Sequence, residues 1–213
     1  MDYNLTLSQI KTSYSYHEYR SKVAELIHTN SCTGNEQTEE RIEFTRLNDH
    51  RMNRVEKQFK TSDELNLRLN NLQCDQIWII LLESWCGDAA QSLPVIAKIA
   101  EATPNIELKI ILRDEHPEIM DQYLTNGGKA IPKLICFDKH SGDEIGSWGP
   151  RPEGIQELVK EFKTSNPDAS HEEFVSNLHL WYGKDRGKMI QQDFTKVIQQ
   201  WSDRCRKVLM EVM

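Results

Sequence analysis

Two apolar segments joined by a helical one constrain the fold of this chain more than any other feature of its sequence. QIWIILLES, at residues 76–84, is a continuous apolar run rich in β-branched residues, as expected for a strand covered on both faces. NIELKIILRD, at residues 105–114, is predicted as a second buried strand. Because residues 85–103 between them have a helical pattern, the two strands are predicted to pair in parallel through a right-handed crossover.

The chain then continues as a shorter helix and an antiparallel hairpin. Residues 115–128 predict a short helix closed by two glycines, and residues 150–162 predict a helix with proline near its start. Residues 131–138 and 144–149 are typical of strands, and the turn residues KHSGD separate them. The order βαβαββα therefore predicts an α/β fold in which one central mixed sheet holds all four strands.

Helical segments flank this core on both sides. Residues 13–30 and 36–60 predict two hydrophilic helices whose thin apolar stripes need a larger body to pack on. After a polar linker, two further amphipathic stretches complete the chain. We therefore expect an N-terminal helical extension at 1–71 that packs on the core, the α/β domain at 72–163 and a C-terminal helical extension at 164–213.

Composition excludes several classes of partner. The 213 residues carry a net charge of −7 without a basic stripe, so nucleic acid is not an expected partner. No apolar run is long enough to span a membrane or to serve as a signal peptide. No ligand spacing predicts a metal or a resident cofactor. The cysteines are sparse and odd in number, which predicts reduced thiols in a cytoplasmic protein rather than a disulfide framework. They are Cys32, Cys74, Cys86, Cys136 and Cys205.

A WCG motif follows the first buried strand, and an Ile-Pro pair at residues 131–132 precedes the hairpin. In this order, the stretches ESWCGDAAQSLPV, ILRDE, AIPKL and WGPRP resemble a single-cysteine WCGDA subgroup of thioredoxin-like proteins. The resemblance covers roughly residues 72–163 and implies a thioredoxin-like fold with helical extensions at both ends. It also implies that Pro132 is cis and faces the reactive cysteine, where it exposes backbone groups to an extended substrate.

Three departures from thioredoxins weaken the case for a dithiol enzyme. Ala89 stands where thioredoxins carry their second cysteine, and Asp88 replaces the proline between the two cysteines. Ile80 occupies the position of a buried acid that helps proton transfer in thioredoxins. A single thiol, Cys86, is therefore the candidate catalytic residue.

Two effects on the pKa of Cys86 oppose each other. The sulfur is expected at the N-terminus of a helix, where free amides and the helix dipole favour a thiolate. Asp88 raises the thiol pKa if its carboxylate is ionised close to the sulfur. The sequence leaves open which effect is larger.

Candidate binding residues gather at the edge of the sheet near Cys86, because ligands of open α/β sheets bind at the carboxyl ends of parallel strands. Arg113 ends the second strand, and Trp148 and Arg151 lie where the hairpin returns to that edge. Since arginine holds a carboxylate in a bidentate fork, we expect a groove for an acidic thiol such as glutathione, or for an acidic peptide. Structural ion pairs for both arginines and a core position for Trp148 are the alternatives. The predicted substrate-binding residues are Trp85, Gly87, Asp88, Arg113, Ile131, Pro132, Trp148 and Arg151.

Two functions of different classes follow from these residues. In the first, Cys86 exchanges with a disulfide or a glutathionylated protein, and an external thiol, with glutathione as a candidate co-substrate, resolves the mixed disulfide. In the second, the fold is kept as a catalytically weak peptide-binding or scaffold module, and the long terminal helices serve partner docking or homodimer formation. The pH dependence of Cys86 alkylation distinguishes the two.

Overall fold

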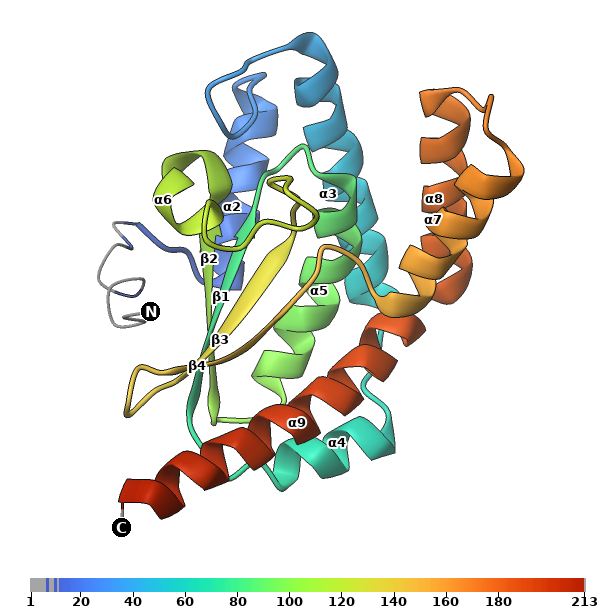
Figure 1. Cartoon of the computed structure of the whole chain (residues 1–213). Helices are drawn as coiled ribbons and strands as arrows, with labels where there is room; N and C mark the ends of the chain where they lie inside the picture. The colour runs from blue at the N-terminus through green and yellow to red at the C-terminus, as the bar shows by residue number, and fades with distance from the viewer. Residues whose placement is uncertain (1–6, 8–9, 11, 213) are drawn as a thin grey trace.

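A four-stranded mixed sheet forms the centre of the molecule in the computed structural model, which describes residues 7, 10 and 12–212 (Figure 1). The strand order is β2-β1-β3-β4. β1 (Gln76–Leu82) pairs in parallel with β2 (Ile106–Leu112) and antiparallel with β3 (Lys133–Asp138). β4 (Glu144–Trp148) extends the sheet antiparallel to β3. The predicted α/β fold with one mixed sheet is confirmed.

β1 is covered on both faces, as its unbroken apolar pattern predicts. Residues 78–82 are fully buried, so side chains on both sides of the pleat lie in the core. Helix α5 (Gly87–Glu101) starts beyond the end of β1 and packs against β2 and α3. The end of β1 and the start of α5 thereby hold the WCGD segment in a fixed position.

The N-terminal helices pack on this core. α2 (Tyr16–His28) begins with a capping box in which Ser15 and Glu18 satisfy each other's backbone amides, and α3 (Glu39–Gln58) begins at the N-cap Thr38. α3 makes its largest contact with α5, which carries the WCGD segment at its start. α4 (Asp63–Asn70), a short helix before β1, was not predicted from the sequence.

The segment after β2 is less helical than its pattern predicts. A 3₁₀ turn, η1 (Arg113–Glu115), leads into α6 (Pro117–Met120). The prediction of a helix over 115–128 is therefore wrong about where the helix ends, because α6 ends at Met120, before the two glycines. Thr125 and Gly128 instead form a bridged turn, in which Gly127 takes a positive φ of 78°.

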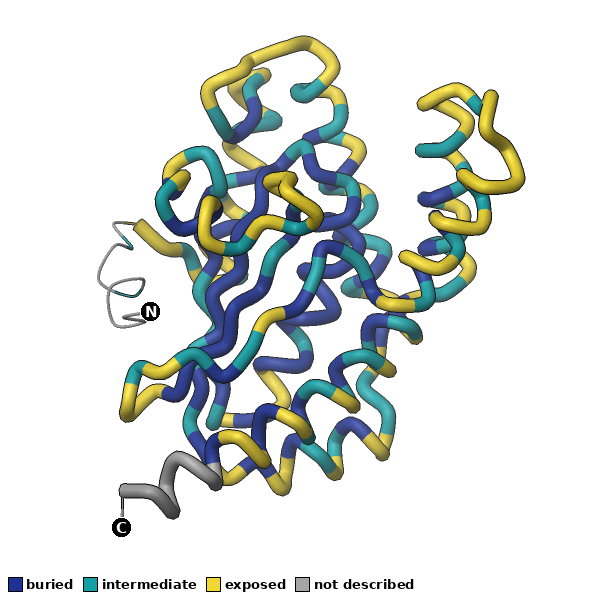
Figure 2. Tube along the Cα trace, in the orientation of Figure 1, coloured by how far each residue is buried: buried dark blue, intermediate teal, exposed yellow. Residues whose placement is uncertain are grey.

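Three helices complete the chain. α7 (Glu153–Ser165) and α8 (His171–Asp185) form a hairpin, and α9 (Lys188–Val212) runs back across the sheet toward α4 and β4 (Figure 1). Figure 2 shows that the outer parts of the α7–α8 hairpin are largely exposed, whereas the sheet is buried. Arg186 and Gly187 turn the chain between α8 and α9 with positive φ angles of 57° and 82°.

The prediction that all the cysteines are reduced is wrong for one pair. Cys74, just before β1, and Cys205, in α9, form a disulfide with a Cα–Cα distance of 6.2 Å. They are 131 residues apart in the sequence, so only the return of α9 across the end of the sheet brings them together. Cys32, Cys86 and Cys136 are free and buried.

Candidate functional site

The sulfur of Cys86 lies between two elements that the fold brings together. Cys86 is the N-cap residue of α5, and its thiol donates a hydrogen bond to the backbone carbonyl of Ile131 at 3.3 Å. The Ile131–Pro132 peptide bond is cis and leads into β3. Cys86 is only 9 % exposed. The thiol therefore faces the segment before β3, with little direct contact with solvent.

Asp88, in the first turn of α5, is buried, and both of its carboxylate oxygens accept hydrogen bonds. Its two carboxylate oxygens accept from Arg151, with Nη2–Oδ2 at 2.7 Å and Nε–Oδ1 at 3.0 Å. The hydroxyl of Tyr182, from α8, donates to Oδ1 at 2.8 Å. Burial raises the pKa of Asp88, while Arg151 and Tyr182 act to lower it. These three donated bonds are those of an ionised carboxylate.

The structure shows which of the two opposing effects on the pKa of Cys86 is larger. Burial and, after it, the charge of Asp88 raise the pKa of the thiol to about 12, and the amides of Ala89 and Asp88 at the start of α5 lower it by less. The thiol is therefore protonated at neutral pH in the resting structure. Its role as hydrogen-bond donor to Ile131 agrees with that state.

Helix α8 lies directly against the motif. A Cβ atom placed on Gly87 would come within 2.6 Å of Cε1 of His179, so a larger residue here would displace this imidazole. Burial, followed by the charges of Arg51, Arg54 and Arg151, lowers the pKa of His179 to about 4. His179 is therefore neutral at physiological pH.

A cavity of about 220 Å³ opens beside the thiol, between α3, the start of α5 and α8. One side is formed by the WCGD segment with Arg51 and Arg151, and the other is mainly apolar. Its lining residues are Phe44, Arg51, Trp85, Cys86, Gly87, Asp88, Arg151, His171, Phe174, Val175, Leu178 and His179. A ligand in this cavity would meet the sulfur of Cys86, a cationic group and an apolar wall.

Comparison with known proteins places this geometry in a family. Residues 34–163 match the family model described as thioredoxin. The chain belongs to the thioredoxin family. The match begins before the predicted domain boundary at residue 72, and it includes α3 and α4 in the family's unit.

Two solved structures share the thioredoxin-family fold of this chain. A protein of unknown function from Pseudomonas aeruginosa, PA1234, is 17 % identical with a TM-score of 0.57, over 87 % of this chain and 98 % of its own. An HIV epitope-scaffold is 19 % identical with a TM-score of 0.53, over 83 % of this chain and 96 % of its own. No curated protein matches the chain. Within the described residues, every helix is too short or too polar to cross a lipid bilayer.

Arg113 and Trp148, which were predicted to bind the substrate, pair with groups outside the cavity of this thioredoxin-family protein. Arg113 pairs with Asp114, its Nε lying 2.8 Å from Oδ1, and its guanidinium lies 5.0 Å from the centre of the Trp85 ring. Trp148 is a core residue: it is 6 % exposed, and its Nε1 donates to Asp193 of α9 at 2.9 Å. The predicted groove with both arginines and an indole is thus not the one that the fold assembles.

The remaining predicted residues lie together. Trp85, Gly87, Asp88 and Arg151 line the cavity with Cys86. Ile131 and Pro132 do not line it, but the Ile131 carbonyl accepts from the Cys86 thiol and a cis bond joins Ile131 to Pro132. Arg151 forms an ion pair with Asp88, so the structural ion pair that was the alternative role for this arginine is present.

Sequence reasoning missed the groups that the flanking helices supply. Arg51 comes from α3, and His179 and Tyr182 come from α8. Each lies at least 30 residues from the motif in the sequence, and no spacing rule connects residues of separate helices. Only amphipathic periodicity signalled that α3 and α8 pack on something.

Two other groups of titratable or metal-ligating side chains are less suited to a functional site. Glu83 is fully buried, its carboxylate accepts from the amide of Asp114 at 2.9 Å, and burial raises its pKa. Cys74, Asp138 and Cys205 are the one group of three metal-type ligands found among the described residues, and its two sulfurs are bonded to each other.

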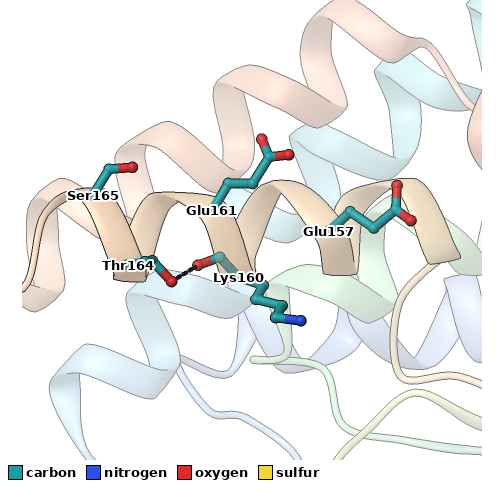
Figure 3. A pocket seen from close by; sticks show the side chains of 5 residues that line it. All are labelled: Glu157, Lys160, Glu161, Thr164 and Ser165. Carbon is teal, nitrogen blue, oxygen red and sulfur yellow. Dashed lines mark hydrogen bonds between the residues drawn. The ribbon is translucent and has the colours of Figure 1, made fainter.

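A larger hollow, of about 490 Å³, lies along the exposed face of α7 (Figure 3). Only consecutive turns of this single helix line it, and the hydroxyl of Thr164 donates a hydrogen bond to the backbone carbonyl of Lys160. Its other lining residues are Glu157, Glu161 and Ser165. It is a solvated helix face, and the cavity beside Cys86 remains the candidate site.

Proposed function

We propose that this thioredoxin-family protein carries out thiol–disulfide exchange or deglutathionylation through Cys86 alone, with an external thiol as the resolving group. The observation that supports this most is the position of the sulfur, at the start of α5, opposite the Ile131 carbonyl and on the wall of a cavity. We further propose that the chain belongs to a single-cysteine WCGDA subgroup and works in the cytoplasm on a thiol or disulfide partner, as a monomer or a homodimer.

The exchange takes place in two balanced steps. The thiolate of Cys86 attacks one sulfur of a substrate disulfide, forms a Cys86–substrate mixed disulfide and expels the other sulfur as a thiolate, while the Cys86 proton goes to solvent. An external thiol then attacks the mixed disulfide through its own thiolate, releases Cys86 as a thiolate and leaves as a disulfide with the substrate sulfur. Since Ala89 stands at the position of a second cysteine, no neighbouring thiol competes with the external one.

The resting site is expected to react slowly. A thiol pKa of about 12 against an ordinary value of 9.0 lowers the thiolate fraction at neutral pH by about a thousandfold. The mechanism therefore needs a state in which the sulfur is less buried, and an outward movement of α8 from Gly87 would produce it.

The same burial favours the alternative function. A protonated thiol that is 9 % exposed is also what a peptide-binding or scaffold module with a vestigial cysteine would have. In that case Cys86 packs as a small apolar residue, and the terminal helices hold the partner.

The test is the formation of a defined adduct. The protein is incubated with glutathione disulfide and quenched with acid, and the modified cysteine is identified by peptide mass spectrometry. Exchange predicts a glutathione adduct on Cys86 that disappears on adding reduced glutathione. The Cys86→Ser variant, and the buried Cys136 within the same sample, are the controls. A Cys86 that stays unmodified over hours, while its alkylation rises only at strongly alkaline pH, would establish the scaffold function instead.

A further inference from the structure

Two arginines of α3 form no ion pair with any described residue. Arg51 and Arg54 lie three residues apart on α3, and so share one face of that helix. Arg51 donates through Nη1 to the amide oxygen of Asn48 at 2.7 Å, and Arg54 donates through Nη2 to that of Gln91 at 3.0 Å. Neither arginine takes part in any ion pair among the described residues.

Both guanidinium groups lie between α3, α5 and α8. Arg51 lines the Cys86 cavity, and its Nη1 is 3.3 Å from where a Cβ on Gly87 would stand. Nη1 of Arg54 is 3.5 Å from the corresponding position on Gly183 of α8. An anion held by Arg51 would therefore lie next to the residue that follows the reactive sulfur.

The charges of the site do not balance. Asp88 is matched by Arg151 in a bidentate pair, and His179 is neutral, which leaves the charges of Arg51 and Arg54 uncompensated. Burial, and after it the nearby charge of Arg54, lowers the pKa of Arg51 to about 10, and the charge of Asp88, which is already paired with Arg151, offsets only part of this shift. Both arginines are half-buried, and cations partly removed from water are normally paired, so an anion would complete this site.

We propose that the cavity binds the carboxylate of a small thiol or disulfide through Arg51, with the charge of Arg54 behind it, and thereby presents its sulfur to Cys86. This specificity rests on the proposed exchange function, and it replaces the predicted anion clamp of Arg113 with Arg151. Guanidinium groups match a carboxylate in geometry, and the apolar wall formed by Phe174 and Leu178 suits the carbon skeleton between carboxylate and sulfur.

The first experiment compares two disulfides that differ in charge. Dithiobis(nitrobenzoate) carries carboxylates and dithiodipyridine carries none, and the rate of Cys86 adduct formation with each is followed by mass spectrometry. Charge-assisted bonds worth about 1.5–3 kcal/mol predict that Arg51→Gln slows the anionic reagent by about tenfold or more, and Arg54→Gln should slow it by less. The neutral reagent should change by less than about twofold, since it makes no such bonds.

Arg46→Gln is the matched control, because Arg46 lies on the same helix but pairs with the exposed Glu43. It should leave both rates unchanged. Equal slowing of the two reagents by Arg51→Gln, or no slowing of either, would overturn the proposal.

A second measurement separates this inference from the exchange function. S-methylglutathione carries carboxylates but no reactive sulfur, and its affinity for the Cys86→Ser variant is measured by calorimetry. Weaker binding after Arg51→Gln, and unchanged binding after Arg46→Gln, supports the anion site even if Cys86 proves unreactive. Binding that is absent, or that ignores Arg51 and Arg54, overturns the site even if Cys86 exchanges.

Discussion

The disulfide between Cys74 and Cys205 should contribute much of the stability of this fold. It closes a loop with a sequence separation of 131 residues. The chain-entropy relation for a loop of this length gives about 5 kcal/mol at 25 °C, because the bond restricts the unfolded chain. With a urea m-value of about 2.5 kcal/mol/M, its loss should lower the unfolding midpoint by about 2 M.

The perturbation is Cys205→Ala, compared with wild type by urea unfolding with and without a dithiol reductant. Wild type should lose stability in reductant, and Cys205→Ala should already be destabilised and should not respond further. Cys32→Ala is the control, since Cys32 is buried but free, and it should cost only about 1–2 kcal/mol through its small cavity.

A thiol count in denaturant shows whether the bond is present. It should give three thiols for the oxidised protein, from the free Cys32, Cys86 and Cys136, and five after reduction. If the count rises from three to five and the midpoint stays the same, the loop-closure reasoning is refuted.

Three further outcomes are expected around the site. Asp88→Asn removes the charge that raises the pKa of Cys86 and leaves Arg151 unpaired, so the pH profile of Cys86 alkylation should shift to lower pH; an unshifted profile would contradict the stated role of Asp88. Tyr182→Phe removes one donor to Asp88 and should lower the free energy of unfolding by about 1–2 kcal/mol, measured in urea against wild type. The folded-state pKa of His179, about 4, lies below its ordinary 6.5, so the unfolded chain binds more protons between these values. Stability should therefore be complete above about pH 6.5 and fall as the pH drops toward 4, and His179→Gln should flatten that slope in acid titrations followed by circular dichroism.

Local patterns predicted most of the fold. The unbroken apolar run of β1 and the helical period between β1 and β2 predicted a parallel pair, and the turn residues before β4 predicted a hairpin. α4 and the early end of α6 were missed, because short helices are decided by what they pack on rather than by periodicity.

The candidate site was less accessible to sequence reasoning. Strand direction indicated correctly which edge of the sheet Arg113 and Trp148 approach, but not where their side chains point. Arg113 turns to Asp114, and Trp148 turns into the core toward Asp193, because the neighbours that satisfy each group are contributed by tertiary structure.

The sequence by itself determined the order of the four strands and of the longer helices, and the single thiol at the start of a helix, since both follow from local chemistry along the chain. Tertiary structure alone decided that α3 and α8 meet at Gly87, that Arg51 lies there and Arg54 lies beside Gly183, and that burial outweighs the helix N-terminus at Cys86. Desolvation and charge pairing depend on which atoms are within a few ångströms of one another, and residues distant in the sequence reach such distances only when the helices pack.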